Sequence, residues 1–292
     1  MTSALHGTSM APTWVNAAHP QGVMRRRPGG RNDAAVTRDD ERLTWVGHAT
    51  VLLELGGVRL LTDPLLRTRL GHLRRHGARP DPAVTEGIDA VLISHVHFDH
   101  LDMRSLRSVA RGARAIAPQG AGRLLRRIGF TRIDEVLPGD RITVGDATVT
   151  ALAAVHDGRR GPLGAPAATL GYEIAGGQRV YFAGDTELFD GMRSFAGRFD
   201  VALLPVWGWG PSLGPGHMDP LSAAQAAAIV RPHIAVPIHW GTFFPVGLEA
   251  LRGSALVEPP RVFARHVAEL APEVEVRVLA PGDELVLGRV AS

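Results

Sequence analysis

From residue 43 onward, hydrophobic residues come in short runs separated by glycine, proline and small polar residues, a pattern typical of β-strands. The run Ile88–Ser94 is almost continuously apolar, as expected of a strand that is buried on both faces. Gly56-Gly57 between two runs predicts a tight hairpin. The predicted strands are Leu43–Val46, Thr50–Leu55, Val58–Thr62, Ile88–Ser94, Ala113–Ala117, Glu135–Leu137, a strand-rich stretch Arg141–Val155, Thr169–Ile174, Arg179–Ala183, Val201–Val206 and Ile234–Ile238.

Helix-like segments alternate with these strands. They are Met103–Ala110, Gly120–Ile128, Leu188–Phe195 and Pro220–Val230. Asp219 is the expected N-cap of the last helix, and Pro220 is its expected first residue. Because strands and helices are mixed in both halves of the chain, we expect an α/β fold with two sheets packed face to face and helices outside, a four-layer αββα sandwich. No linker is visible after residue 40, so residues 41–292 are predicted to form a single domain.

Residues 1–40 lack this periodicity. They are rich in glycine, proline and arginine, and the tract 24–31 reads MRRRPGGR, so we interpret them as a flexible basic tail. Its charge allows at most peripheral contact with an anionic membrane. No apolar run has the length of a membrane span and no signal peptide is recognisable, which favours a cytoplasmic protein.

Composition excludes several chemistries. The 292 residues contain no cysteine, which rules out disulfides, thiolate nucleophiles and thiolate metal sites. All 32 basic residues are arginine, so neither a Schiff-base lysine nor a phosphate-loop lysine is available. The net charge of only +3 gives no support to nucleic-acid binding. The sequence leaves open a homo-oligomer.

The segment that follows the apolar run Ile88–Ser94 predicts a metal site. It reads HVHFDH and holds four potential ligands, His95, His97, Asp99 and His100. Alternate residues of an extended segment point the same way, so His95 and His97 can meet one ion while the next two side chains serve a second. Imidazole suits zinc well.

This spacing resembles the His-x-His-x-Asp-His signature of the metallo-β-lactamase superfamily. The resemblance implies the αββα fold of that superfamily and three further ligands, His156, Asp185 and His239, with Asp185 between the two ions. It also implies that Asp63, at the end of an early strand, supports the metal-binding loop. Two Zn²⁺ per chain are expected, with Mn²⁺ or Fe²⁺ as alternatives. The histidine at position 97 favours zinc, since redox diiron members of the superfamily have glutamate there.

Further motifs resemble one branch of this superfamily. They are Thr44–Thr50, Leu61–Pro64, Ser94–Asp102, Gly184–Thr186, His217–Pro220 and Ile238–Phe243. Together they are similar to the N-acyl-phosphatidylethanolamine-hydrolysing phospholipase D branch and, at the opening motif, to ascorbate phosphate lactonases. This resemblance implies hydrolysis of a small or lipid-like phosphodiester or phosphorylated ester by a water held between the two ions. Asp99 is then a candidate proton acceptor.

Other residues are candidates for substrate contact. His217, on a glycine-rich loop before a helix, is a candidate for substrate contact or proton transfer. His48 is a second candidate, and Trp207 and Trp209 are expected to line an apolar groove. The loop Arg67–Arg79 holds five arginines and no acid, which indicates a possible grip on phosphate.

Four other functions remain open. A lactonase would use the same metals on a cyclic ester, and a nuclease would bind RNA in a salt-sensitive manner. A β-lactamase or a glyoxalase-type thioesterase is disfavoured, and such a thioesterase would usually have glycines after the cluster, where this chain has Leu101-Asp102. A non-catalytic binding protein is disfavoured because all seven ligand positions are filled.

Overall fold

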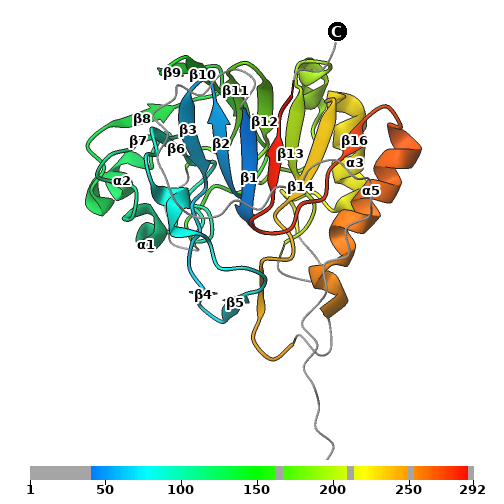
Figure 1. Cartoon of the computed structure of the whole chain (residues 1–292), viewed down its shortest axis with the longest axis horizontal. Helices are drawn as coiled ribbons and strands as arrows, with labels where there is room; N and C mark the ends of the chain where they lie inside the picture. Colours follow the sequence, from blue (N-terminus) through cyan, green and yellow to red (C-terminus); the bar gives the residue numbers. More distant parts are fainter. Residues whose placement is uncertain (1–40, 162–166, 209–213, 249–252, 289–292) are drawn as a thin grey trace, which may run out of the picture.

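Two seven-stranded sheets face each other, and helices cover their outer sides (Figure 1). The computed structural model describes residues 41–161, 167–208, 214–248 and 253–288. The predicted basic tail of residues 1–40 and the substrate candidate Trp209 lie outside the described residues. The predicted αββα sandwich is confirmed, whereas the single-domain boundary at residue 41 stays a prediction.

The first sheet is built mainly from the N-terminal half of the chain. In spatial order its strands are β17 (Glu284–Val286), β1 (Arg42–Gly47), β2 (Thr50–Leu55), β3 (Val58–Thr62), β6 (Ala90–Leu92), β7 (Arg114–Pro118) and β8 (Ile133–Val136). The pairs from β3 to β8 are parallel, and β17 closes the sheet by pairing antiparallel with β1. The short helices α1 (Met103–Leu106) and α2 (Gly122–Ile128) lie on its outer side (Figure 1).

The second sheet is built from the C-terminal half. In spatial order its strands are β16 (Glu275–Val276), β14 (Ile234–Ile238), β13 (Val201–Pro205), β12 (Arg179–Phe182), β11 (Leu170–Ala175), β10 (Ala147–Ala153) and β9 (Arg141–Val144). Helices α3 (Pro220–Val230) and α5 (Glu258–Leu270) cover its outer side (Figure 1). Asp219 caps α3 as predicted, because its carboxylate accepts from Ser222 N at 2.8 Å and Ser222 Oγ accepts from Asp219 N at 2.9 Å.

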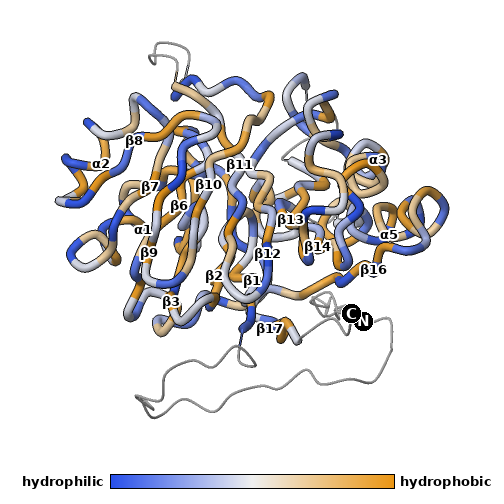
Figure 2. Tube along the Cα trace, turned by 90° about the horizontal axis from the view of Figure 1, so that it is seen from above, coloured by the Kyte–Doolittle hydropathy of each residue, from blue (hydrophilic) through white to orange (hydrophobic). Residues whose placement is uncertain are grey.

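Consecutive residues of a strand pack into two different hydrophobic cores. Leu53 packs into the large cluster between the sheets, while its neighbour Leu52 packs into a second cluster beneath α1 and α2. Val91 and Leu92 divide in the same way, because successive side chains of a strand point to opposite faces. This explains why the residues Ala90–Ile93 at the centre of this run are all apolar. Interior strands are accordingly largely orange in the hydropathy view, and many peripheral loops are blue (Figure 2).

A third, small sheet projects from the sandwich (Figure 1). It consists of β4 (Arg69–Leu70), β5 (Leu73–Arg75) and β15 (Phe243–Pro245). The sequence pattern did not predict it, nor did it predict α5, β16 and β17. The remaining segments of regular structure are 3-10 turns, Pro82–Thr85, Asp190–Phe195 and Gly253–Leu256.

Helix predictions were less accurate than strand predictions. The segment 103–110 is helical only over Met103–Leu106, and the predicted helix at 188–195 is a 3-10 turn that starts at Asp190. Within the described ranges, no helix is long and apolar enough to cross a membrane.

The parallel strands bring several loops to one edge of the sandwich. β1, β3 and β6 run in the same direction in the first sheet, as do β10, β12, β13 and β14 in the second. The residues that follow these strands include all seven predicted metal ligands. The fold therefore gathers them where the two sheets meet.

Candidate metal centre

Three histidine nitrogens converge in a first group. His97 Nδ1 lies 2.9 Å from His95 Nε2 and 3.1 Å from His156 Nε2. These three side chains form one group of potential ligands, although the first two follow β6 and the third follows β10. Ligand atoms about 2.0–2.1 Å from a tetrahedral zinc are separated by about 3.3 Å, so the spacing is close to that of a zinc site.

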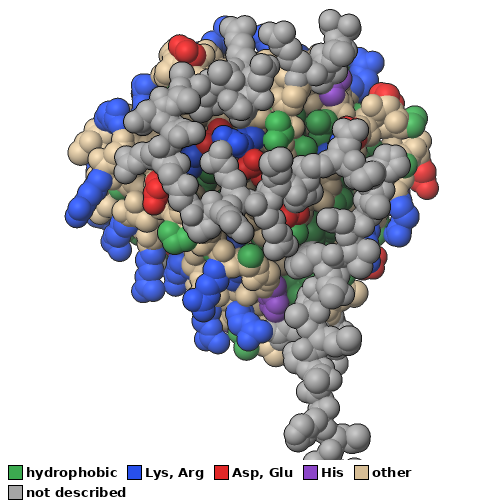
Figure 3. Space-filling model, viewed as in Figure 1, with side chains coloured by type: hydrophobic (Ala, Val, Ile, Leu, Met, Phe, Trp, Pro, Cys, Tyr) green, Lys and Arg blue, Asp and Glu red, His purple; other side chains and the backbone are tan. Residues whose placement is uncertain are grey.

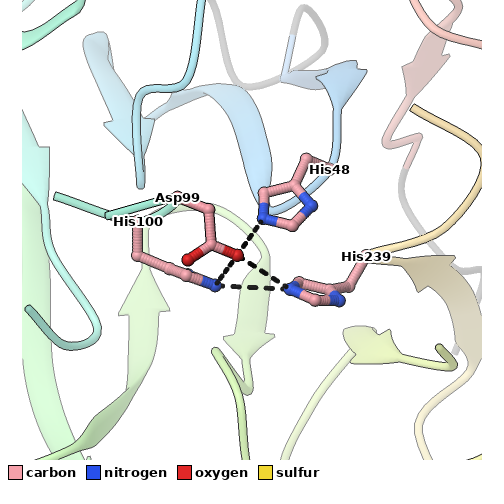
Figure 4. A group of neighbouring side chains, drawn as sticks. All are labelled: His48, Asp99, His100 and His239. Carbon is pink, nitrogen blue, oxygen red and sulfur yellow. Dashed lines mark hydrogen bonds and ion pairs between the residues drawn. The ribbon is translucent and has the colours of Figure 1, made fainter. Parts of the chain in front are cut away.

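A second group contains two histidines and two carboxylates. His100 Nε2 lies 3.2 Å from Asp185 Oδ2, and His239 Nε2 lies 3.3 Å from both His100 Nε2 and Asp185 Oδ1. Asp99 Oδ2 faces the same two rings at 3.6 and 3.9 Å (Figure 4). Asp185 also groups with His156, so it lies between the two sets.

Hydrogen bonds at Nδ1 fix the orientation of three of the rings. Gly216 O is 2.7 Å from Nδ1 of His156, and Trp207 O is 2.5 Å from Nδ1 of His239. Ser94 Oγ lies 2.9 Å from Nδ1 of His95. With the proton at Nδ1, a neutral ring directs the Nε2 lone pair into the centre, which is the tautomer that a metal requires.

Asp63 supports both groups through hydrogen bonds with Ser94 and His100. Its Oδ2 lies 2.7 Å from His100 Nδ1 and accepts from Ser94 Oγ at 2.5 Å, while Oδ1 accepts from Ser94 N at 2.7 Å. Ser94 Oγ in turn accepts from His95. One fully buried carboxylate therefore orients a histidine of each group, consistent with the predicted supporting role. Sequence reasoning assigned no role to Ser94, although its place directly before His95 was a signal.

The electrostatics of the centre favour the protonation states that metal ligands need, which are neutral histidine rings and ionised carboxylates. Burial lowers the pKa of His95 well below its ordinary value and that of His156 to about 4, so both rings are neutral. Burial alone would raise the pKa of Asp99 and Asp185, but the surrounding histidines hold both well below the usual range.

His100 behaves in the opposite way. Burial alone would lower its pKa, but the carboxylates of Asp185, Asp99 and Asp63 raise it well above the ordinary value. His100 therefore carries a proton in the metal-free cluster. A metal ion bound there would take over the positive charge and release that proton.

The residues fit a metal centre. Within the described part of the chain, Asp185 Oδ1 is buried and accepts no hydrogen bond. It faces Nε2 of His239. Because Nδ1 of this ring donates its proton to Trp207 O, Nε2 of the neutral ring carries a lone pair. Two acceptors that face each other at 3.3 Å are stabilised by a cation between them. Seven nitrogen and oxygen donors without sulfur suit zinc, manganese or iron.

His217 lies at the rim of the centre. Its Nε2 is 3.8 Å from Asp185 Oδ2, its ring is 4.6 Å from that of His156, and its side chain is 26% exposed. The loop is held because Glu187 Oε2 accepts from Gly216 N at 3.0 Å. His217 therefore lies beside the centre and is partly exposed, and its role in substrate contact or proton transfer stays a prediction.

The expectation that the arginines of the loop Arg67–Arg79 grip phosphate is wrong for two of the five. Arg75 is buried and donates to the backbone oxygens of Val46, Leu65 and Arg67, and its guanidinium stacks over Phe243. Burial lowers its pKa to about 10. Arg67 pairs with Asp102 at 3.2 Å. Both hold the small sheet to the sandwich.

The remaining substrate candidates lie deeper than expected. His48 is 2% exposed and contacts Asp99 instead of the surface. Trp207 is half-buried, its ring is 6.2 Å from that of Phe244, and it lines a small hollow with His48, Trp240 and Phe243. Their roles in substrate binding stay predictions.

Arg160 supports the metal-binding loop, and no sequence signal marked it. Its Nη1 donates to Val96 O at 2.6 Å and to Leu101 O at 3.0 Å. The guanidinium also stacks 4.3 Å from the ring centre of Phe98, a side chain that is 56% exposed. Arg160 therefore ties the segment after His156 to the segment that carries four ligands.

Replacing Arg160 with methionine should lower the free energy of unfolding of the metal-free protein by about 1–3 kcal/mol, because the carbonyls of Val96 and Leu101 lose their donor. Urea denaturation measures this. The neighbouring exposed Arg159→Met is the matched control and should change stability little. Equal effects of both substitutions would contradict the role given to Arg160.

Comparison with known proteins identifies the family. The sequence matches the β-lactamase superfamily domain over residues 58–240, more than half of the chain. The chain belongs to the metallo-β-lactamase superfamily. This confirms the predicted superfamily, while the resemblance to its phospholipase-D-like branch stays a prediction.

Several known proteins are similar to this one over most of the chain. A protein of Aeropyrum pernix described as a metal-dependent hydrolase is 32% identical over 259 residues, which cover 83% of this chain and 96% of that protein. An uncharacterised protein of Mycobacterium tuberculosis is 33% identical over 241 residues, 75% of this chain and 65% of that protein. The solved structure of a metallo hydrolase from Ignicoccus hospitalis matches with a TM-score of 0.61 at 24% identity, covering 84% of this chain and 97% of its own. That structural likeness supports the fold alone.

Proposed function

We propose that this protein is a dinuclear zinc-dependent hydrolase of phosphodiesters or phosphorylated esters. The observation that carries the proposal is the pair of ligand groups that meet at Asp185. The relatives described as metal-dependent hydrolases support the same reaction class. When bound, two ions would supply Lewis acidity and acidify a water molecule for attack.

The protein's own side chains divide the remaining work. The buried Asp185 and the partly buried Asp99 hold negative charge at the centre, and the neutral rings of His95 and His156 complete the binding surface. His217 Nε2 at the rim is placed to contact the substrate or to move a proton to the leaving oxygen. Asp99 Oδ2 is the candidate proton acceptor, although the contact with His48 already occupies this oxygen.

Two features favour an anionic ester. Arg69 and Arg74 of the small sheet are exposed, and basic side chains gather at the lower edge of the molecule, where Figure 1 places β4 and β5 (Figure 3). No acidic residue occurs from Arg67 to Pro80. A phosphate-bearing substrate is attracted to such an edge.

Reloading the metal-free protein tests this function. We expect chelator-stripped protein to be inactive on bis-p-nitrophenyl phosphate and to regain activity as about two equivalents of zinc are added. Mn²⁺ and Fe²⁺ loading in parallel compares the alternative metals. Hydrolysis of simple lactones alone would refute the phosphoester and favour a lactonase. Salt-sensitive RNA binding would point to a nuclease, and less than one zinc per chain to a binding protein.

A further inference from the structure

The turn that carries His48 is attached to the segment that carries a metal ligand. His48 follows β1 and has a φ of 56°, a conformation that few non-glycine residues adopt. Its backbone N donates to Thr242 Oγ1 at 2.7 Å, and its carbonyl accepts from His239 N at 2.9 Å. Trp45 Nε1 donates to the same carbonyl at 3.0 Å. The position of His48 is therefore coupled to that of His239.

The side chain of His48 reaches a second ligand. Its Nε2 lies 3.1 Å from Asp99 Oδ2, the same oxygen that faces His100 and His239 (Figure 4). A carboxylate oxygen accepts hydrogen bonds, so in this contact His48 Nε2 is the donor. The ring of His48 also lies 4.0 Å from the ring of His239.

We propose that His48 is a positioning residue that sets the affinity of the second metal ion by holding Asp99 Oδ2 and the ring of His239. The proposal rests on the dinuclear centre of the proposed function. His48 groups with Asp99, His100 and His239, whereas the first ion would be held by a separate group of three histidines. Loss of the His48 donor should therefore weaken the second ion and leave the first largely unchanged.

The hydrogen bond acts by limiting the freedom of a carboxylate. The Asp99 side chain is 14% exposed, so water replaces the imidazole donor poorly. Without the donor, the carboxylate gains rotamers that direct Oδ2 away from the ligand group, and binding must then pay for ordering it. Removal of such supporting hydrogen bonds typically costs about 10–100-fold in metal affinity.

Two variants separate the hydrogen bond from the ring. His48→Leu removes the donor and puts an apolar side chain of similar size in place of the imidazole ring. In His48→Gln, the side-chain amide nitrogen replaces the Nε2 donor. Both substitutes carry a Cβ at the same positive φ and have comparable backbone strain, so their difference reports on the donor. His233→Leu, at an exposed histidine far along the chain, is the control for histidine loss.

The experiment measures metal binding by the full chain and not its activity. Metal-free wild type and variants are titrated with Co²⁺, followed by visible absorption, and with Zn²⁺ against a chromophoric chelator. We expect His48→Leu to bind the first ion like the wild type and the second about 10–100-fold more weakly. His48→Gln should bind both ions close to the wild type. Thermal unfolding of the metal-free proteins checks that each variant folds.

Three outcomes overturn the proposal. The first is an unchanged affinity for the second ion in His48→Leu, and the second is an equal loss of affinity for both ions. The third is that His48→Gln binds the second ion as weakly as His48→Leu, which would make His48 a ligand or a packing residue. A wild type that binds only one ion refutes the two-metal function, and the proposal fails with it. If His48→Leu does not fold, His48→Asn replaces it, because asparagine tolerates positive φ but its amide is too short to reach Asp99.

Discussion

Replacing Asp185 with asparagine should reduce hydrolysis by about 10³-fold or more and lower the metal content of the purified protein. The carboxylate lies between the two ligand groups, 3.2 Å from His100 Nε2 and 3.3 Å from His239 Nε2. A neutral amide removes the negative charge that both ions would share. Metals contribute several kcal/mol to such reactions, and each 1.36 kcal/mol corresponds to a tenfold change in rate.

The measurements are kcat/KM on bis-p-nitrophenyl phosphate and metal analysis of the same samples. Asp190→Asn, at an exposed position in the next 3-10 turn, makes the same chemical change outside the centre and should leave both quantities unchanged. An Asp185→Asn protein that retains two ions and wild-type activity would refute the proposed centre.

Replacing Asp63 with asparagine should lower the affinity for both metal ions by about 10–100-fold, although Asp63 is not itself a predicted ligand of either ion. The carboxylate accepts from Ser94 and from His100, so an amide places a donor opposite a donor. Because Asp63 is fully buried, the mismatch should also cost about 1–3 kcal/mol of unfolding free energy in the metal-free protein. Asparagine tolerates the φ of 31° at this position, so backbone strain does not account for the change.

Chelator competition measures the affinities, and urea denaturation of the metal-free protein measures stability. Asp89→Asn is the control, because Asp89 lies at an exposed position and its carboxylate accepts only from the backbone N of Arg59 among the contacts that the structure describes. If Asp63→Asn lost stability but bound both ions normally, Asp63 would be a packing residue and its supporting role would be wrong.

Strands and ligands were predictable for the same physical reason. Thr50–Leu55 and Val58–Thr62 were predicted to the residue, because a strand with a core on each face is apolar at most of its positions. The ligands follow such runs directly, so sequence order alone placed them at strand ends.

Contacts between distant segments left no such trace. Arg160 contacts Val96 and Leu101 across more than 50 residues, and Arg75 looked like its exposed neighbour Arg74. The strand β17 is short and pairs with β1 only through tertiary structure. Residues that hold a centre in place were therefore missed more often than the residues that form it.

The location of the ligands between the two sheets has a consequence for folding. The first group takes His95 and His97 from the first sheet and His156 from the second, and the second group divides in the same way. Neither group is complete until the two halves of the chain have docked. Each ion would then act as a cross-link between distant halves, and at a hundred times its dissociation constant it would add about 2.7 kcal/mol to the native state. The hydrolytic centre would therefore also stabilise the packing of the two sheets against each other.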